Sequence, residues 1–339
     1  MRRERPCPGP VPRRRTRQEG WTVGRAPGAL GAGAPDAAPS GAGQADPGGC
    51  TVVTGASGLI GRAVSAALGA SRPVLALSRR DPELGGAPGV TVVRGDFARL
   101  EQGQPLGPPA LAVHTVVHLA AVTGGCSEDD ALRVNVAGTL AMMGHMAARG
   151  CRRFILAGSI AAVGIADPAF QPRALPIADD HPCLARDAYG MSKHLMEDAA
   201  AYAARRFEGL DVLCLRLASV ADDRRLPPLR SARLLGAWGL GGITVMALSD
   251  AVRLLVAACD APLRPGFRVR NAAPARAWVR DPMARFLEAW YGDAVDTGPF
   301  LRPGHEFDSP FDVSRLETEV GFTARLPAPP SQAGAAARP

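Results

Sequence analysis

The residues with the clearest chemical potential are a tyrosine and a lysine four positions apart, Tyr189 and Lys193. In a helix, residues i and i+4 lie on the same face, one turn apart. A phenol has a pKa of about 10 and is a poor base at neutral pH, but an adjacent ammonium favours the phenolate. The spacing therefore predicts acid/base chemistry by Tyr189, assisted by Lys193.

The composition of the chain makes this pair more informative. Of the 39 basic residues, 38 are arginines and one is Lys193, and Tyr189 is one of only three tyrosines. Such a skew is typical of a chain in which lysine has drifted to arginine wherever the chemistry permits. A guanidinium is a planar, bulkier fork and cannot replace a compact ammonium. We therefore expect Lys193 to do something that arginine cannot do.

A glycine-rich turn lies upstream of the pair, directly after the first apolar run. One glycine permits a tight turn, another lets backbone N–H groups approach a pyrophosphate at a helix N-terminus, and a third lets helix and strand pack closely. The strand-to-helix context favours a nucleotide site over a simple turn. The candidate cofactor-binding residues of this turn are Gly55, Ser57, Gly58, Leu59, Ile60 and Gly61.

The ends of the next two strands bear on which dinucleotide is bound. A dinucleotide fold places an acid near the adenosine ribose at the end of the second strand, but Arg79 and Arg80 stand there instead. Guanidinium groups suit a 2′-phosphate, which favours NADP over NAD. The alternative is that these arginines are surface charges that face water and bind no cofactor. Asp96, followed by Phe97, is a candidate acceptor for the adenine amine, and an ordinary turn aspartate is the alternative.

These residues need a scaffold, and the apolar pattern predicts one. Short apolar runs alternate with helical patterns, which is typical of an α/β fold with a doubly wound parallel sheet, the Rossmann fold. Strands are expected at 50–54, 73–78, 90–94, 114–119, 152–157 and 212–217, and helices at 59–68, 129–149, 188–206 and 249–259. Ser159 then follows the fifth strand, and Tyr189 and Lys193 share one helix.

The composition also divides the chain into parts. Residues 1–49 contain ten glycines and eight prolines, and we expect a disordered extension there, with a similar tail at 327–339. The extension is interpreted as a transit peptide, a basic arm or a dispensable segment from an upstream start codon, and its single serine favours the last. The NAD(P)-binding domain with the catalytic residues covers 50–217. A small substrate-binding subdomain covers 218–326.

Charge and cysteine usage exclude several classes of protein. Residues 1–49 carry eight arginines against four acids, which is +4 of the net charge of +7. The remaining residues are therefore nearly balanced in charge, and no nucleic-acid partner is expected.

Seven scattered cysteines without CxxC spacing predict neither a disulfide framework nor a zinc site and fit a cytoplasmic location. His114 and His118 share a strand face without a third ligand, so no metal is expected. Neither a secretory signal nor a membrane span is predicted.

Taken together, the motifs resemble the extended short-chain dehydrogenase/reductase family, the NAD(P)-dependent epimerase/dehydratase group, over about residues 50–325. The matching segments follow the order of the family. They are TGASGLIG at 54–61, GDF at 95–97, HLAA at 118–121, NVAGT at 135–139, FILAGS at 154–159, YGMSK at 189–193, LRL at 215–217 and the closing helix at 312–322.

The resemblance implies a role for each matched position. Tyr189 is the acid/base, Lys193 holds the nicotinamide ribose and tunes Tyr189, and Ser159 hydrogen-bonds the substrate oxygen. Asn135 supports the active site from a helix. The resemblance also implies a homodimer formed through the helices at 129–149 and 188–206. The cofactor contacts that it adds after the fourth strand are Leu119, Ala120 and Ala121.

The chain departs from the family after the sixth strand. Relatives continue into a Tyr-Gly-Pro turn and a long segment that wraps a nucleotide sugar, whereas a short linker follows here. Members similar to uronate dehydrogenase are also short here, but they tend to have an acid where Arg79 stands. We expect an NADPH-linked ketoreductase for a sugar-like small molecule. The alternatives are an NAD-dependent nucleotide-sugar epimerase or dehydratase, a sugar-acid dehydrogenase and a nucleotide-sensing protein without turnover.

Overall fold

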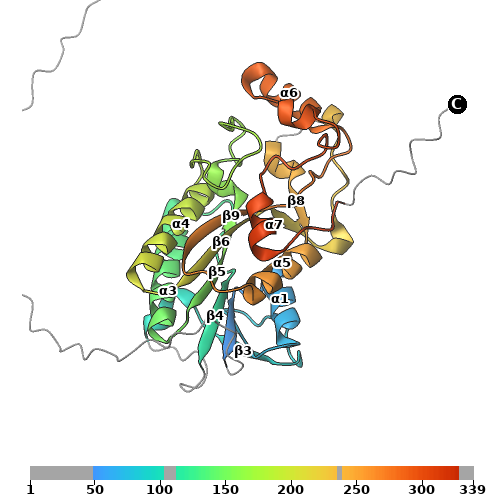
Figure 1. Ribbon diagram of the computed structural model, residues 1–339. Helices are drawn as coiled ribbons and strands as arrows, with labels where there is room; N and C mark the ends of the chain where they lie inside the picture. The colour runs from blue at the N-terminus through green and yellow to red at the C-terminus, as the bar shows by residue number, and fades with distance from the viewer. Residues whose placement is uncertain (1–48, 103–111, 235–238, 328–339) are drawn as a thin grey trace, which may run out of the picture. The chain divides into compact units, whose positions relative to one another are not determined.

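The computed structural model describes residues 49–102, 112–234 and 239–327 (Figure 1). The N-terminal extension and the C-terminal tail lie outside the described residues, apart from Gly49 and Pro327. Within the described ranges, the main sheet has seven parallel strands in the order β3-β2-β1-β4-β5-β6-β9. In that order, they are β3 Val90–Arg94, β2 Val74–Ser78, β1 Cys50–Thr54, β4 Val113–His118, β5 Arg153–Ser159, β6 Asp211–Leu217 and β9 Gly266–Ala272.

The central strands form because their residues are suited to burial on both faces. Every residue of β1 and of β6 is buried, as expected for parallel strands covered by helices on either side. The strand order reverses between β1 and β4, which pair directly with Thr54 opposite His118. Ligands of doubly wound folds bind at this switch point, beyond the carboxyl ends of the strands. The fold class predicted from the sequence is confirmed.

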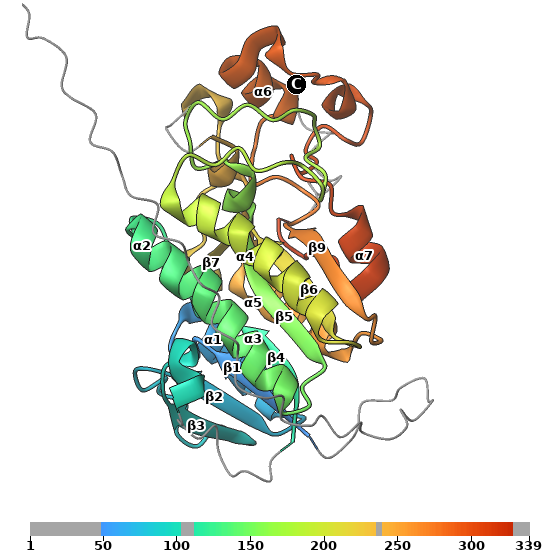
Figure 2. The same cartoon turned by 90° about the vertical axis from the view of Figure 1, so that its left-hand side faces the viewer.

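Helices cover both faces of the sheet. α3 and α4 contact each other on one face, and α1 and α5 contact each other on the opposite face (Figure 2). The helices are α1 Leu59–Gly69, α2 Glu128–Asp130, α3 Thr139–Ala148, α4 Ala188–Arg206, α5 Leu248–Asp260, α6 Met283–Tyr291 and α7 Ser314–Val320.

Among the residues that the structure describes, none of the helices combines the length and the apolar character that crossing a membrane requires.

The helix expected at 129–149 is not a single α-helix. α2 continues into a π-helix, η2 (Ala131–Gly138), and α3 begins only at Thr139. π-helical turns are rare and are frequent at functional sites. This one carries the buried side chain of Asn135. The sequence did not indicate it, because a segment of eight residues is too short for the wider turn to be distinguished from an α-helix by its apolar pattern.

A strand that the sequence did not indicate, β9, pairs with β6 at the edge of the sheet. Part of the region 218–326 therefore belongs to the main sheet. Two arginines in β9 obscured its pattern, and neighbouring acids pair with both. Arg268 contacts Asp211 of β6 and Glu319 of α7, and Arg270 also contacts Glu319. Glu319 of α7 thus pairs with both arginines of the strand.

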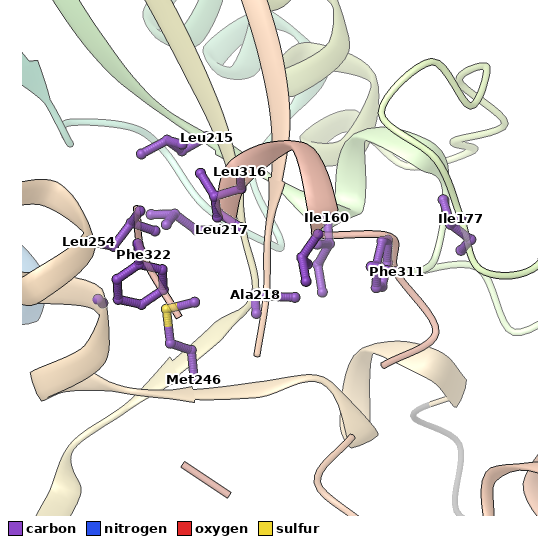
Figure 3. Packing of buried hydrophobic residues seen from close by; sticks show 14 of the residues in the cluster. Ile160, Ile177, Leu215, Leu217, Ala218, Met246, Leu254, Phe311, Leu316 and Phe322 are labelled. Carbon is purple, nitrogen blue, oxygen red and sulfur yellow. The ribbon is translucent and has the colours of Figure 1, made fainter. Parts of the chain in front are cut away.

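One buried apolar cluster joins the C-terminal segments to the end of β6 (Figure 3). It includes Leu215 and Leu217 of β6, Leu254 of α5, Leu316 of α7 and Phe322 beyond α7. Burying one such side chain stabilises the fold by about 1.5–3 kcal/mol. The cluster thereby fixes these helices and the C-terminal segment against the carboxyl end of β6.

The buried ion pair between Arg216 of β6 and Glu197 of α4 gives a first prediction. Both N–H···O distances are 2.8 Å, and each side chain is 4% exposed. Arg216→Leu removes the bidentate partner of the buried Glu197 carboxylate and leaves it only His194, at 3.7 Å, as an ion-pair partner. We expect the variant to lower the free energy of unfolding by about 3–5 kcal/mol in urea denaturation.

The matched control is Arg62→Leu, which removes a pair with Glu83 whose side chains are 48% and 78% exposed. Exposed pairs contribute roughly 0–1 kcal/mol. Equal losses of unfolding free energy in the two variants would contradict a structural role for the buried pair.

Candidate active site

A cavity of about 870 Å³ lies at the carboxyl ends of the central strands. The short parallel strands β7 (Ser219–Ala221) and β8 (Val245–Ala247) contribute to its wall, together with Pro227 and Arg230. Most of the candidate residues from the sequence line this cavity. They are Gly55, Gly58, Leu59, Ile60, Gly61, Leu119, Ala121, Ser159, Tyr189 and Lys193.

The glycine turn between β1 and α1 has the geometry of a nucleotide cradle. Gly55 adopts a φ of +70°, and a Cβ there would lie 2.7 Å from the backbone nitrogen of Ala120. A Cβ on Gly61 would collide with the Gly55 carbonyl oxygen. Side chains at these positions would therefore separate the turn from α1 and from the end of β4. The N-terminus of α1 meets the cavity here and suits the pyrophosphate of a dinucleotide.

The first turn of α4 brings Tyr189 to the end of β5. Asp187 caps the helix, and its Oδ1 accepts a hydrogen bond from the Gly190 nitrogen at 2.8 Å. A Cβ on Gly190 would lie 2.6 Å from the Ala161 carbonyl oxygen, so only glycine permits this close approach. As a result, the side chains of Tyr189 and Ser159 lie close enough for the Ser159 hydroxyl to lower the pKa of Tyr189. The structure brings together the two residues that the sequence places 30 positions apart.

Lys193 lies one helical turn further along α4 and is 3% exposed. Its Nζ donates a hydrogen bond to the Ala157 carbonyl oxygen at 2.7 Å and lies 5.8 Å from the centroid of the Tyr189 ring. Burial lowers the pKa of Lys193 to about 8, although Cys214 and Glu197 act in the opposite direction. The ammonium is therefore present at neutral pH but is easier to deprotonate than an exposed lysine.

The pKa of Tyr189 differs from the sequence-based expectation. Burial raises it above the ordinary value for a phenol, and the hydrogen bond from Ser159 only partly offsets this effect. The sequence led us to expect that a nearby ammonium lowers this pKa. In the protein without ligands the pKa is raised instead, because the loss of water around the phenolate is the larger effect. Tyr189 is thus a neutral phenol in the protein without ligands.

Asn135 connects the loop after β4 to α4 and does not line the cavity. Its Oδ1 accepts from the Val122 nitrogen at 2.9 Å, and its Nδ2 donates to the Val122 carbonyl at 3.0 Å and to Ser192 Oγ at 2.9 Å. Ser192 Oγ in turn donates to the Tyr189 carbonyl oxygen at 2.9 Å. Asn135 therefore supports the backbone of Tyr189 and makes no direct contact with the reacting groups.

The remaining cofactor candidates lie outside the cavity lining. Arg79 is exposed at the end of β2, and Ser57 and Ala120 belong to the two loops that meet at Gly55. The Oδ1 of Asp96 accepts a hydrogen bond from the Ala98 nitrogen at 3.0 Å, which is the geometry of a turn aspartate. Phe97 is buried, with its ring 4.7 Å from that of His118.

Sequence analysis missed one residue of the cavity lining, Arg230, which comes from an irregular segment where no periodic pattern could have identified it. It named His118 but not its contacts: the ring is buried at the end of β4 between two threonines that come from distant positions in the chain. Within the described ranges, no three His, Cys, Asp or Glu side chains are grouped as metal ligands.

The model of the NAD dependent epimerase/dehydratase family matches residues 51–237, which is more than half of the chain. The chain therefore belongs to this family. It is an NAD(P)-dependent enzyme of the extended short-chain dehydrogenase/reductase type, which confirms the resemblance seen in the sequence. No curated protein matches the chain.

Solved structures share the fold. MoeE5 in complex with UDP-glucuronic acid and NAD is 26% identical, with a TM-score of 0.59 over 82% of this chain and 94% of that chain. A mutated uronate dehydrogenase is 26% identical, with a TM-score of 0.53 over 67% of this chain and 74% of that chain. A superfamily member from Agrobacterium tumefaciens with bound NAD, at 22% identity, has a TM-score of 0.58 and covers 81% and 92% of the two chains.

The lowered pKa of Lys193 predicts a pH dependence of cofactor binding. Affinity for reduced cofactor should fall several-fold as the pH rises through about 8, because the ammonium that favours binding loses its proton. A fluorescence titration of the cofactor over this pH range measures the effect. Lys193→Met should bind more weakly and show no change in this range. A wild-type affinity that stays constant through about pH 8 would contradict the assignment.

Proposed function

We propose that the protein transfers hydride between a nicotinamide dinucleotide and the carbinol or keto carbon of a sugar-like substrate, with Tyr189 as the acid/base. One observation carries the proposal. Tyr189 contacts Ser159 and lies over the buried ammonium of Lys193, and all three residues line the cavity that begins at the glycine turn. This arrangement offers a proton acceptor and a hydrogen-bond donor to one substrate oxygen.

Each side chain has a separate role in this mechanism. Ser159 donates a hydrogen bond to the substrate oxygen and keeps it beside the Tyr189 hydroxyl. In the oxidative direction, the Tyr189 hydroxyl first releases its proton to solvent, and the resulting phenolate takes the O–H proton of the carbinol as the carbinol C–H bond breaks, its hydride leaves for the nicotinamide, and the C=O bond forms. In the reductive direction, Tyr189 returns that proton. The nicotinamide, when bound, supplies the hydride acceptor or donor.

Lys193 assists in two ways. An ammonium has three N–H donors, and the Ala157 carbonyl takes one of them, which leaves donors for the hydroxyls of the nicotinamide ribose. Its positive charge beside the Tyr189 ring also stabilises negative charge on the phenol oxygen during proton transfer. Asn135 acts through Ser192 and holds the first turn of α4 in place.

A sugar-type substrate is supported by the relatives at 26% identity, one bound to UDP-glucuronic acid and one a uronate dehydrogenase. The second candidate function is therefore an NAD-dependent sugar-acid dehydrogenase or nucleotide-sugar epimerase. A panel of keto sugars, free sugar acids and nucleotide sugars separates these outcomes. Consumption of NADPH indicates a ketoreductase, formation of NADH a dehydrogenase, and isomerised product without net cofactor change an epimerase.

The cofactor preference depends on Arg79. We propose NADP as the preferred cofactor, because an exposed guanidinium at the end of β2 suits a 2′-phosphate and no acid occupies that position. The relatives named above that contain a dinucleotide hold NAD, so the proposal is specific to this chain. The homodimer and the cytoplasmic location stay predictions.

The acid/base assignment predicts that Tyr189→Phe abolishes turnover while the dissociation constant for cofactor changes less than about threefold, since the ring keeps its packing and only the hydroxyl is lost. Steady-state kinetics on the substrate found by the panel and a cofactor titration measure the two effects. The control is Tyr202→Phe on the exposed side of the same helix, which should leave the rate unchanged. Wild-type turnover by Tyr189→Phe would reject the mechanism.

The phosphate-reading role predicts that Arg79→Asp changes the preference from NADPH toward NADH by at least about tenfold, because a carboxylate repels the 2′-phosphate and accepts from a free 2′-hydroxyl. Parallel titrations with both cofactors measure the ratio of dissociation constants. Arg205→Asp makes the same charge change at the exposed end of α4 and should leave the ratio unaltered. An unchanged ratio in Arg79→Asp would show that this arginine is only solvated.

A further inference from the structure

His118 is a buried titratable side chain that the proposed mechanism does not use. It ends β4 and is 2% exposed. Its Nδ1 lies 2.7 Å from Thr54 Oγ1, at the end of β1, and its Nε2 lies 3.0 Å from Thr139 Oγ1, at the start of α3. The ring also meets Phe97 edge-on. One imidazole therefore joins three segments that surround the cofactor cradle.

The hydrogen bonds around Thr54 define the protonation of this ring. Thr54 Oγ1 accepts from the backbone nitrogens of Leu119 at 3.2 Å and Ala120 at 3.3 Å. A hydroxyl has two acceptor lone pairs and one hydrogen, so this hydrogen is directed to His118 Nδ1. The proton on the ring is then on Nε2 and is donated to Thr139. Burial, and then the charge of Lys193, lower the pKa of His118 to about 3, so the ring stays neutral.

These bonds fix the contact between the two cofactor turns. Thr54 directly precedes Gly55, and a Cβ on Gly55 would come within 2.7 Å of the Ala120 nitrogen. The backbones of the loops after β1 and β4 are thus in contact, and there is no room between them for a side chain at Gly55. A Thr54 hydroxyl that rotated away would take its acceptor from the Ala120 nitrogen and leave the Leu119 nitrogen with only the Thr54 carbonyl oxygen, at 3.3 Å. The loop that carries Leu119 into the cavity wall would then be held less firmly.

We propose that His118 is a positioning residue for the dinucleotide: by accepting the Thr54 hydroxyl hydrogen, it holds that hydroxyl toward the Leu119 and Ala120 nitrogens and keeps the two cofactor turns in register. The proposal rests on the cofactor site assigned above. It differs from a packing role because it depends on one acceptor atom, the Nδ1, and not on the volume of the ring.

The test compares variants that separate the acceptor from the volume. His118→Leu keeps bulk without an acceptor, and Thr54→Val removes the hydroxyl itself. Each should weaken cofactor binding about tenfold, as expected for one or two lost hydrogen bonds. The double variant should be no weaker than either single variant, because both changes remove the same interaction. His118→Asn, whose Oδ1 takes the place of Nδ1, should restore affinity to within about threefold of wild type.

Cofactor titrations with NADH and NADPH and thermal unfolding of each full-length variant complete the design. Met146→Ala, at a fully buried position of α3, controls for lost stability and should lower the melting temperature without changing the dissociation constant. If His118→Leu is folded and binds cofactor like wild type, or if His118→Asn binds as weakly as His118→Leu, the inference is overturned. Failure of the wild-type protein to bind either cofactor would instead reject the proposed function.

Discussion

The site depends on one constraint, the burial of an ammonium group beneath a tyrosine. A buried charge is costly unless it is hydrogen-bonded or paired, and Lys193 meets this requirement through the Ala157 carbonyl and the nearby carboxylate of Glu197. Glu197 is in turn held by Arg216 on β6. The Lys193 ammonium is thus tied to the sheet through two strands, to β5 through Ala157 and to β6 through Glu197 and Arg216, and α4 must pack closely on both strands. Gly190 permits that close packing where α4 meets the end of β5.

Close contact between backbone segments also shapes the part of the cavity that we assign to the cofactor. Two loops meet at Gly55 and Ala120, where neither has room for an extra side chain, and Thr54 connects both through hydrogen bonds. The glycine turn and the pair formed by Tyr189 and Lys193 therefore share two requirements. In both places backbone segments pack closely against each other, and buried polar groups must find hydrogen-bond partners where water is excluded. The proposed function depends on this rigidity, because the proposed acid/base transfer requires hydrogen-bond contact between Tyr189, Ser159 and one substrate oxygen.

The sequence predicted the central strands and the closeness of Tyr189 and Lys193 for identifiable physical reasons. Strands buried on both faces are continuous apolar runs, and residues four apart in a helix lie on the same face. The catalytic role of the pair, which the single lysine among 38 arginines suggested, stays a prediction. It could not predict β9, whose arginines are paired by acids from distant elements, nor the π-helical turn around Asn135, which is too short to be distinguished from an α-helix by its apolar pattern. It also missed the surroundings of His118 and the place of Arg230 in the cavity, because both depend on contacts between segments far apart in the chain. The sign of the Tyr189 shift was wrong because desolvation is a property of the folded protein.

The most direct test of the central claim is a crystal structure of the full-length protein with its preferred nicotinamide cofactor. The account predicts the pyrophosphate at the N-terminus of α1, the ribose hydroxyls within hydrogen-bond distance of Lys193 Nζ, and the nicotinamide ring facing the hydroxyls of Tyr189 and Ser159. A cofactor bound with its nicotinamide away from Tyr189, or with no contact to Lys193, would contradict it.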